Sequence, residues 1–346
     1  MKILHGPKNT GGMAGLLARA QRRLGHDAWS VNYQPTNFDY FCDQIFTNPA
    51  IIGRMWEWAW FVLAKAPRFD VFHFYFGESL CGPKLWDVPC LKRMGKRVFF
   101  YFCGCDIRDS KHTVKTYKPS VCAACWPMNC SRNRLKARRM ALEHADGIFV
   151  STPDLLEFVP GAVLLPQPID LEKFEALAQS GHSSVPPGRP GVDRPVRLAH
   201  APSNWKMKGT AIIVAAVERL RRRGLKVELV LVENKPYAEA VTIRNTCDLG
   251  VDQLLVGAYG QCAVEMMAMG KPTICYIRPD ILPLYRQGCP IILASADNFE
   301  EVLAEWVAHP EWWPRIGEKS KRYVREVHDM CAVAKVCLDT YPKNSR

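Results

Sequence analysis

The sequence has no uninterrupted hydrophobic run long enough to span a membrane. Its longest apolar stretch, residues 50–66, is broken by Arg54, Glu57 and Lys65, whereas a spanning helix needs about 20 apolar residues. The apolar start of the chain ends at Gly6 and does not form the apolar region of a secretory signal. The sequence also lacks a short-period repeat and a low-complexity tract. We therefore expect a cytosolic protein and exclude a membrane-spanning chain.

The composition is that of a globular protein of about two domains. The 346 residues are 48% hydrophobic and 10% aromatic, which is apolar material for roughly two cores at about 150 residues per domain. This content excludes disordered and collagen-like chains and small scaffolds held only by disulfides. Lys and Arg number 46 against 34 Asp and Glu, a formal net charge of +12. The positive charge favours anionic partners, which are phosphate-bearing ligands, nucleic acid or an anionic membrane surface.

The first half of the chain alternates between strand and helix patterns. Short apolar runs predict strands, and longer stretches with helical spacing of apolar residues predict helices. The predicted strands are residues 2–5, 28–33, 70–76, 97–103 and 147–151, and the predicted helices are residues 12–24, 51–64, 84–94 and 132–144. This alternation indicates a parallel sheet covered by helices on both faces.

The alternation stops in a segment rich in Ser, Gly and Pro and then starts again. Residues 180–195 show no apolar period, and we expect the connection between two domains there. Further strands are predicted at 196–200, 226–232, 254–256, 272–277 and 291–294, and further helices at 210–223, 237–244, 262–269 and 299–309. We expect a last helix, at about 312–328, to pack on the first domain.

These patterns predict an α/β protein made of two doubly wound domains that face a cleft. Ligands bind at the carboxyl ends of the strands in such sheets. The expected limits are residues 1–170 for the first domain, which includes a cysteine-rich loop at 103–130, and 171–195 for the linker. The second domain is expected at 196–320, and a C-terminal helix and tail at 321–346.

Two loops that lead from a strand into a helix are suited to bind an anion. Gly11 and Gly12 precede the first predicted helix, where glycine lets backbone N–H groups approach an anion; a tight turn without a ligand is the alternative. Ser203, Lys206 and Lys208 precede a helix of the second half. A lysine there is placed to neutralise a diphosphate at the helix N-terminus, and a solvated surface lysine is the alternative.

A third segment, residues 257–272, carries one carboxylate on an otherwise apolar helix. That residue is Glu265, and Tyr259 and Gly260 stand just before the helix. A buried carboxylate without a partner costs several kcal/mol. We therefore expect Glu265 to have a hydrogen-bonding partner, and ribose hydroxyls would serve.

Taken together, these segments resemble the GT-B fold glycosyltransferases of the family 4 type, over nearly the whole chain. The resemblance rests on the glycine loop, on Lys208-Gly209 and on the run from Tyr259 to Pro272. It implies two Rossmann-like domains, a nucleotide-sugar donor bound by the second domain, and transfer with retention and without a catalytic metal. It also implies that Lys208 contacts the diphosphate and Glu265 holds the ribose. The expected donor-binding residues are Gly11, Gly12, Ser203, Lys206, Lys208, Tyr259, Gly260 and Glu265.

Three positions depart from the pattern of this family. Gly257 stands where the family has a first glutamate, and Ser203 stands where it often has an arginine, with Lys206 as a nearby cation. The family's His-Gly-x-Asp is Cys103-Gly104-Cys105-Asp106 in this chain. His73 is a substitute for the missing histidine or a buried structural residue. Asp106 is the expected polar contact to the acceptor and, with Lys208 and Glu265, completes the expected catalytic set.

A cluster of cysteines is the feature least typical of the family. Cys122 and Cys125 form a C-x-x-C pair, Cys130 follows, and Cys105 precedes. Four thiolates from one loop favour a tetrahedral structural zinc site. Thiols without a metal and an iron–sulfur cluster are the alternatives, and His112 replaces Cys105 in a second possible ligand set.

A basic run and an aromatic helix bear on membrane contact. Residues 132–139 include five cations, which form either a solvated helix face or a docking surface for a phosphate-bearing acceptor or anionic lipid headgroups. Trp56, Trp58, Trp60 and Phe61 lie on the helix predicted at 51–64. They either reinforce such contact or pack in the core.

The leading hypothesis is a cytoplasmic glycosyltransferase with peripheral contact to the inner face of the membrane. It moves a sugar from a nucleotide-sugar donor to a glycan, lipid-linked or protein acceptor, as in polysaccharide biosynthesis. The alternative is a GT-B protein that has lost catalysis and serves as a binding or scaffold protein, which Gly257 and Cys103 suggest. A metal-containing nucleic-acid binder is a third reading, but the sequence lacks paired ligand sets. We therefore expect no nucleic-acid partner.

Overall fold

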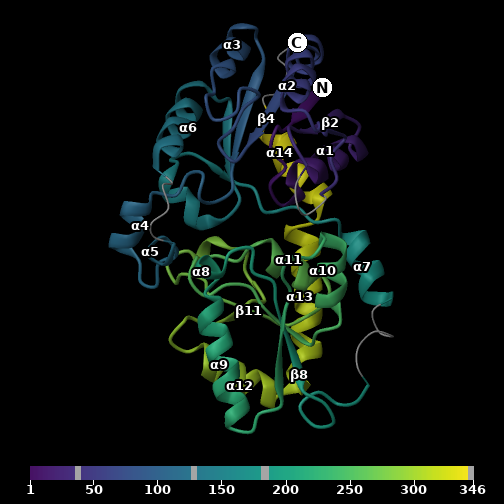
Figure 1. Ribbon diagram of the computed structural model, residues 1–346, viewed down its shortest axis with the longest axis vertical. Coiled ribbons are helices and arrows are strands. Elements are labelled where there is room, and N and C mark those ends of the chain that lie inside the picture. Colours follow the sequence, from purple (N-terminus) through teal and green to yellow (C-terminus); the bar gives the residue numbers. More distant parts are fainter. Residues whose placement is uncertain (36–39, 126–130, 181–186, 342–346) are drawn as a thin grey trace. The chain divides into compact units, whose positions relative to one another are not determined.

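The computed structural model describes residues 1–35, 40–125, 131–180 and 187–341. The chain divides into two compact units, each shown in Figure 1. Unit 1 comprises Met1–Asp109, Asn129–Ile169 and Met330–Arg346, and unit 2 comprises Ser110–Met128 and Asp170–Asp329. The chain therefore passes from one unit to the other four times, whereas the sequence pattern shows a single linker.

Unit 1 is built on a parallel sheet, which among the described residues has seven strands in the order β3-β2-β1-β4-β5-β6-β7. The strands are β1 (Lys2–His5), β2 (Asp27–Asn32), β3 (Gln44–Ile45), β4 (Val71–Tyr75), β5 (Arg97–Phe102), β6 (Gly147–Val150) and β7 (Val163–Leu164). All five residues of β4 are buried, because helices cover both faces of a parallel sheet. The strand order reverses between β1 and β4, which is a topological switch point.

Helices of unit 1 pack on both faces of this sheet. They are α1 (Met13–Arg23), α2 (Ile51–Trp60), α3 (Asp87–Arg93), α6 (Ser131–His144) and α14 (Met330–Thr340). The core on one face contains Phe72 and Phe100 together with residues of α3 and α6. The core on the other face contains Val71 and Phe99 together with residues of α1 and α14.

Unit 2 is built on a second parallel sheet, whose described strands follow the order β12-β11-β10-β8-β9. These strands are β8 (Val196–His200), β9 (Val227–Leu231), β10 (Leu249–Val251), β11 (Thr273–Cys275) and β12 (Ile292–Leu293). The helices are α4 (Ser110–Thr116), α5 (Val121–Ala124), α7 (Leu171–Ser180), α8 (Trp205–Lys208), α9 (Thr210–Arg222), α10 (Tyr237–Asn245), α11 (Gln261–Ala268), α12 (Phe299–Ala308) and α13 (Trp313–Val327). The strand order reverses between β8 and β10, so this unit also has a switch point.

Several elements differ from the sequence-based expectations, among them β3, β7, α4 and α5, which the pattern does not predict. The strand expected at 254–256 is a loop, because the chain turns after β10 and the backbone N–H of Leu254 donates to the carbonyl of Lys208. Helix α7 occupies part of the expected linker. The helix that returns to unit 1 is α14, which packs on α1, whereas α13 packs on α11 within unit 2.

No helix in the described part of the chain is both long and apolar enough to cross a membrane.

Candidate functional site

The carboxyl edge of the unit 2 sheet brings three polar segments together. Lys208 ends α8, which follows β8, and Asp252 and Arg278 lie in the loops after β10 and β11. Ligands of doubly wound sheets bind at this edge, next to the switch point. In unit 2 that point lies between β8 and β10, so Lys208 and Asp252 stand on its two sides.

Lys208 forms a buried ion pair with Asp252. The Lys208 Nζ lies 2.5 Å from Asp252 Oδ1, and the two side chains are only 14% and 1% exposed. Asp252 Oδ2 accepts a hydrogen bond of 2.6 Å from the backbone N–H of Gly260, at the start of α11. Burial lowers the pKa of Lys208, but the Asp252 carboxylate outweighs that effect and the pKa is raised. The lysine is therefore charged and held beside the N-terminus of α11.

His200, at the end of β8, forms hydrogen bonds that connect the strands on either side of this ion pair. Its Nδ1 lies 3.0 Å from the carbonyl oxygen of Val251 and its Nε2 lies 2.9 Å from Thr210 Oγ1. Burial lowers the pKa of His200 to about 4, so the ring is neutral at physiological pH. We infer a structural role that links β8, β10 and the first turn of α9.

Glu265 has two partners within unit 2. Its Oε2 lies 2.6 Å from Arg244 Nη2, and both side chains are 4% exposed. Its Oε1 accepts a hydrogen bond of 2.8 Å from the hydroxyl of Tyr237. Burial lowers the pKa of Arg244, and the Glu265 carboxylate more than restores it, so the net shift is upward. The expected partner of Glu265 is thus found on α10.

Cys262 lies in the first turn of α11 and connects the two ion pairs. Arg244 Nη1 donates to its Sγ at 3.4 Å, and both Lys208–Asp252 and Arg244–Glu265 act on it electrostatically. Burial is the main effect and raises the pKa of the thiol. One polar cluster therefore extends from Lys208, at the end of α8, to Arg244 on α10; Figure 1 labels both helices.

The other residues expected at the donor differ in their exposure. Ser203, just before α8, and Lys206, within α8, are both exposed. Tyr259 is 2% exposed, and its hydroxyl lies 2.9 Å from His328 Nε2. The Tyr259 side chain is therefore part of the unit 2 core, and only its backbone remains for contact with a ligand.

Gly257, where the family resemblance implies a glutamate, lies against Arg278. Its φ is +86°, and a Cβ built on it would lie 2.6 Å from Arg278 Cγ. Arg278 pairs with Asp280 at 2.9 Å, and its guanidinium lies 3.6 Å from the ring centroid of Tyr117. The space beside Gly257 is thus filled by an arginine stem, and any side chain at position 257 would be strained.

Asp106 lies in unit 1, at the carboxyl end of β5. Its carboxylate accepts hydrogen bonds from the backbone N–H groups of Cys103, at 3.0 Å, and Gly104, at 2.7 Å. Burial raises the pKa of Asp106 to about 6, against the opposing effect of these hydrogen bonds. The group therefore changes its charge near neutral pH, which suits a proton acceptor.

The glycine loop before α1 is capped within unit 1. Gly11 and Gly12 have positive φ values of +60° and +77°. The Asn9 Oδ1 accepts from the backbone N–H of Ala14 at 3.1 Å and of Gly15 at 3.4 Å. Two donors of the helix N-terminus are thus satisfied by the chain itself, which fits the tight-turn alternative.

His73 lies in the sheet core of unit 1. It is 0% exposed, its Nδ1 lies 3.1 Å from the hydroxyl of Tyr341, and its ring stacks on Tyr75. Burial keeps the pKa of His73 well below its usual value. These contacts are those of a buried structural histidine.

The described residues offer no group of three His, Cys, Asp or Glu side chains that could hold a metal ion. Cys105, Cys122 and Cys125 are partly exposed, and Cys130 lies outside the described residues. A zinc site therefore has no support in this part of the chain. Metal analysis of the purified protein tests it, because stoichiometric zinc would revive the prediction and its absence would remove it.

Sequence reasoning missed Asp252, Arg244 and Arg278. The sequence could have indicated Asp252, because it directly follows a buried strand, at the edge where doubly wound sheets bind ligands. No sequence pattern indicates Arg244 or Arg278, because a single arginine near the end of a helix or in a loop is common.

Known proteins are similar to this chain in structure. No protein-family profile matches it, and no curated protein sequence matches it. HepE of Anabaena, solved with UDP and glucose, is 13% identical, with a TM-score of 0.65 over 98% of this chain and 99% of that chain. Sucrose-phosphate synthase from Thermosynechococcus elongatus is 16% identical, with a TM-score of 0.65 over 98% of this chain and 97% of that chain. The catalytic domain of starch synthase IV from Arabidopsis thaliana, bound to ADP and acarbose, is 12% identical, with a TM-score of 0.61 over 99% and 98%.

These similarities establish the fold. The chain has the GT-B fold of glycosyltransferases, and the predicted fold class is confirmed.

Proposed function

We propose that the protein is a glycosyltransferase that takes a sugar from a nucleotide-sugar donor bound by unit 2. The observation that carries this proposal is the polar cluster of Lys208–Asp252 and Arg244–Glu265 at the carboxyl edge of a GT-B sheet. The similar structures of HepE and starch synthase IV hold UDP and ADP. A nucleoside diphosphate combines an anionic diphosphate with ribose hydroxyls, which are the groups that such a cluster recognises.

Lys208 is the proposed contact to the diphosphate. Its ammonium has three N–H donors, and Asp252 accepts at least one of them and fixes its position. Cleavage of the glycosidic bond adds negative charge to the departing diphosphate. A cation held in place beside a helix N-terminus stabilises that charge without having to reorganise. We therefore assign Lys208 to leaving-group stabilisation and Asp252 to positioning.

Glu265 is the proposed contact to the ribose. Each carboxylate oxygen has more than one acceptor position, so the hydrogen bonds from Arg244 and Tyr237 leave room for ribose hydroxyls. Arg244 orients the carboxylate through its ion pair, since an arginine is charged at all physiological pH values. Ser203, Lys206, Tyr259 and Gly260 complete the proposed donor-binding set in unit 2, with Tyr259 acting through its backbone.

Asp106 is the proposed contact to the acceptor hydroxyl. With its pKa near 6, the carboxyl is largely ionised at pH 7 and accepts a hydrogen bond from the hydroxyl. The departing diphosphate then takes part in removing the proton, and no protein nucleophile is needed. Retention of configuration and catalysis without a metal are parts of this proposal. The proposed acceptor is a glycan, a lipid-linked sugar or a protein, reached at the cytoplasmic face of a membrane.

A GT-B scaffold without catalysis is the second candidate. The contact of Gly257 with Arg278 favours it, because the position where the resemblance implies a carboxylate has neither the side chain nor the space for one.

Donor binding and turnover separate the two candidates. The purified chain is screened by thermal shift against UDP-, GDP-, ADP-, TDP- and CMP-sugars, since a ligand that binds the folded state raises the melting temperature. Release of the nucleoside diphosphate, or of CMP from a CMP-sugar, is then measured with the donors that bind. Turnover supports the glycosyltransferase, and binding without turnover supports the scaffold. An absence of both contradicts the two proposals together.

A further inference from the structure

The helix formed by α2 and its continuation presents an apolar face to solvent. The π-helical turn η2 (Phe61–Lys65) follows α2 directly. Exposed fractions on the outward side run from 56% for Met55 to 78% for Leu63. The outward apolar face consists of Ile51, Ile52, Met55, Trp56, Trp60 and Leu63.

The inward side of the same helix is also apolar and is packed. Trp58 stacks on Phe61 with ring centroids 5.5 Å apart, and its Nε1 donates to the carbonyl of Leu80 at 2.9 Å. Phe61 is 1% exposed. A surface helix of a globular protein normally turns polar residues outward, so the apolar outward face has no role in folding unit 1. Single exposed apolar residues are common, but a contiguous set marks an interaction site.

Cations border this outward face. Lys65 Nζ lies 5.2 Å from the ring centroid of Trp60. Arg68, one turn further along the chain, is exposed. Trp and Lys together are suited to a membrane interface, since the indole sits at the level of the headgroups and the ammonium meets their phosphates.

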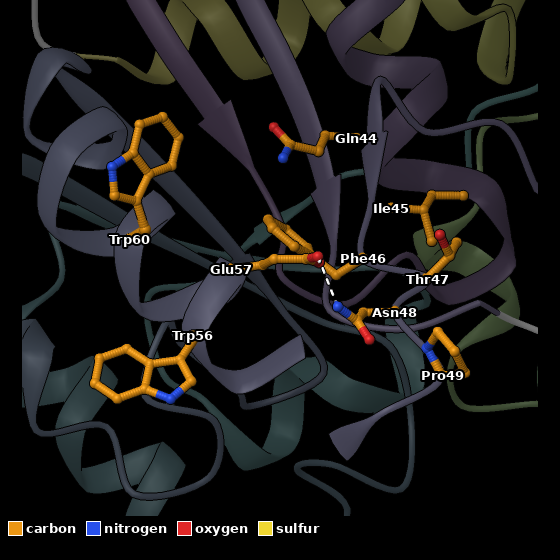
Figure 2. A pocket seen from close by; sticks show the side chains of 9 residues that line it. All are labelled: Gln44, Ile45, Phe46, Thr47, Asn48, Pro49, Trp56, Glu57 and Trp60. Carbon is orange, nitrogen blue, oxygen red and sulfur yellow. Dashed lines mark hydrogen bonds between the residues drawn. The ribbon is translucent and has the colours of Figure 1, made fainter. Parts of the chain in front are cut away.

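An open hollow of about 670 Å³ lies beside this face, between α2 and residues 44–49 (Figure 2). Trp56 and Trp60 line one side of it, and Gln44, Thr47 and Asn48 line the other. Asn48 Nδ2 donates to Glu57 Oε1 at 2.9 Å. The surface thus changes from apolar to polar over a short distance, as a bilayer surface does.

The chemistry of the face favours a bilayer over a second copy of this chain. An interfacial helix needs a stripe of apolar and aromatic residues with flanking cations, and Lys65 beside Trp60 belongs to such a stripe. A two-fold contact between copies would also bring each set of cations close to its own equivalent.

We propose that the outward face of α2 and η2 docks on a bilayer surface that contains anionic lipid. The helix lies in the plane of the interface, with Trp56, Trp60 and Leu63 inserted and Lys65 and Arg68 at the phosphates. The assignment moves the docking surface away from the basic run of α6, where Arg134 is 7% exposed and donates to the carbonyl of Arg108. Membrane docking adds a partner to the proposed glycosyltransferase. The docking itself does not require sugar transfer, but its biological role rests on the proposed function.

Vesicle sedimentation tests the proposal without any sugar donor. The full chain is mixed with vesicles of zwitterionic phosphatidylcholine, or with vesicles in which about one third of the lipid is anionic phosphatidylglycerol. We expect binding to the anionic vesicles that weakens as salt is added, because exposed charges are screened. The variant Ile52→Ser/Trp56→Ser/Leu63→Ser is expected to bind at least tenfold more weakly. The matched control Leu135→Ser/Leu142→Ser removes exposed apolar residues of α6 and is expected to bind like the original chain.

Each other outcome overturns the proposal. Equal binding by the triple variant excludes the α2 face, and loss of binding only in the α6 control assigns docking to α6. No binding to either vesicle excludes a lipid partner, and a dimer that the triple variant dissociates identifies a second copy instead. Circular dichroism and nucleotide binding of the triple variant show that it is folded and report on the donor site separately.

Discussion

Lys208 and Asp252 are 44 residues apart in the chain, yet their side chains meet at 2.5 Å, because they follow two strands that are neighbours in the sheet. Asp252 also accepts the backbone N–H of Gly260. This one carboxylate therefore fixes the lysine and the start of α11 relative to each other, at the edge where doubly wound sheets bind ligands. The proposed diphosphate contact depends on this geometry.

Replacement of Lys208 by alanine is expected to weaken donor binding or reduce turnover at least tenfold. The change removes a charge-assisted contact of about 1.4 kcal/mol or more. Calorimetric titration with the donor found in the screen measures the affinity. The control is Lys319→Ala, which removes an exposed lysine of α13. Equal affinities for the two variants would show that Lys208 has only a structural role.

Replacement of Glu265 by glutamine is expected to lower both stability and nucleotide affinity. Breaking a buried ion pair leaves Arg244 charged without its partner, which costs roughly 3–5 kcal/mol in the free energy of unfolding. Denaturant titration measures this loss, and Glu301→Gln on the exposed face of α12 is the control.

The double variant Glu265→Gln/Arg244→Met separates the two roles of Glu265. It removes both charges, so we expect stability to recover in part while nucleotide affinity stays low. Recovery of the affinity as well would contradict a direct contact between Glu265 and the ribose.

Replacement of Gly257 by alanine is expected to destabilise unit 2 more than the same change at Gly288. Their φ values are +86° and +85°, so both variants carry the strain of a left-handed residue, roughly 1–2 kcal/mol. Only Gly257 has Arg278 within reach of the new Cβ, because nothing lies within 4 Å of Gly288. Denaturant titration of the two variants gives the difference. Equal losses would mean that the Arg278 stem moves aside freely.

Asp106 is expected to make stability depend on pH between about 4 and 6. Its pKa in the folded state, about 6, lies above the value near 3.9 of an unfolded chain. Protonation therefore stabilises the folded state: the contribution is complete below pH 4 and is lost as the pH rises to 6, a total of roughly 3 kcal/mol.

The variant Asp106→Asn isolates this effect. The amide oxygen keeps an acceptor for Cys103 and Gly104, so we expect the variant to fold and to lack this part of the pH dependence. Denaturant titrations at several pH values compare it with the original chain and with Asp297→Asn, an exposed control. An unchanged slope in Asp106→Asn would place the pKa of Asp106 near its ordinary value.

Much of the fold is predictable from the sequence because its signals are local. Buried parallel strands such as β4 and β5 are continuous apolar runs, and the helices between them have their own period. The prediction of a strand at 254–256 was wrong because it rested on such a local apolar pattern alone. Leu254 is buried like a strand residue, but its backbone bonds to Lys208 and not to a neighbouring strand.

The chemistry of the candidate site is predictable only in part. Lys208 and Glu265 stand out by their position next to glycine and on an apolar helix, and both lie in the polar cluster of unit 2. Their partners Asp252 and Arg244 depend on which strands and helices become neighbours, which no local pattern states. The exposure of Trp56 and Trp60, against the burial of Trp58 and Phe61, likewise depends on where unit 1 places its core.

The sequence by itself determined the α/β alternation and the two doubly wound domains, because these follow from spacing along the chain. The GT-B fold and the donor roles proposed for Lys208 and Glu265 follow from the family resemblance of their motifs. Tertiary structure alone decided the pairing of Lys208 with Asp252 and Glu265 with Arg244, the arginine stem beside Gly257, and the apolar face of α2. Those features arise where strand order and helix packing bring distant residues together. The free energy of folding that fixes this order and packing comes from contacts throughout the core, not from one segment.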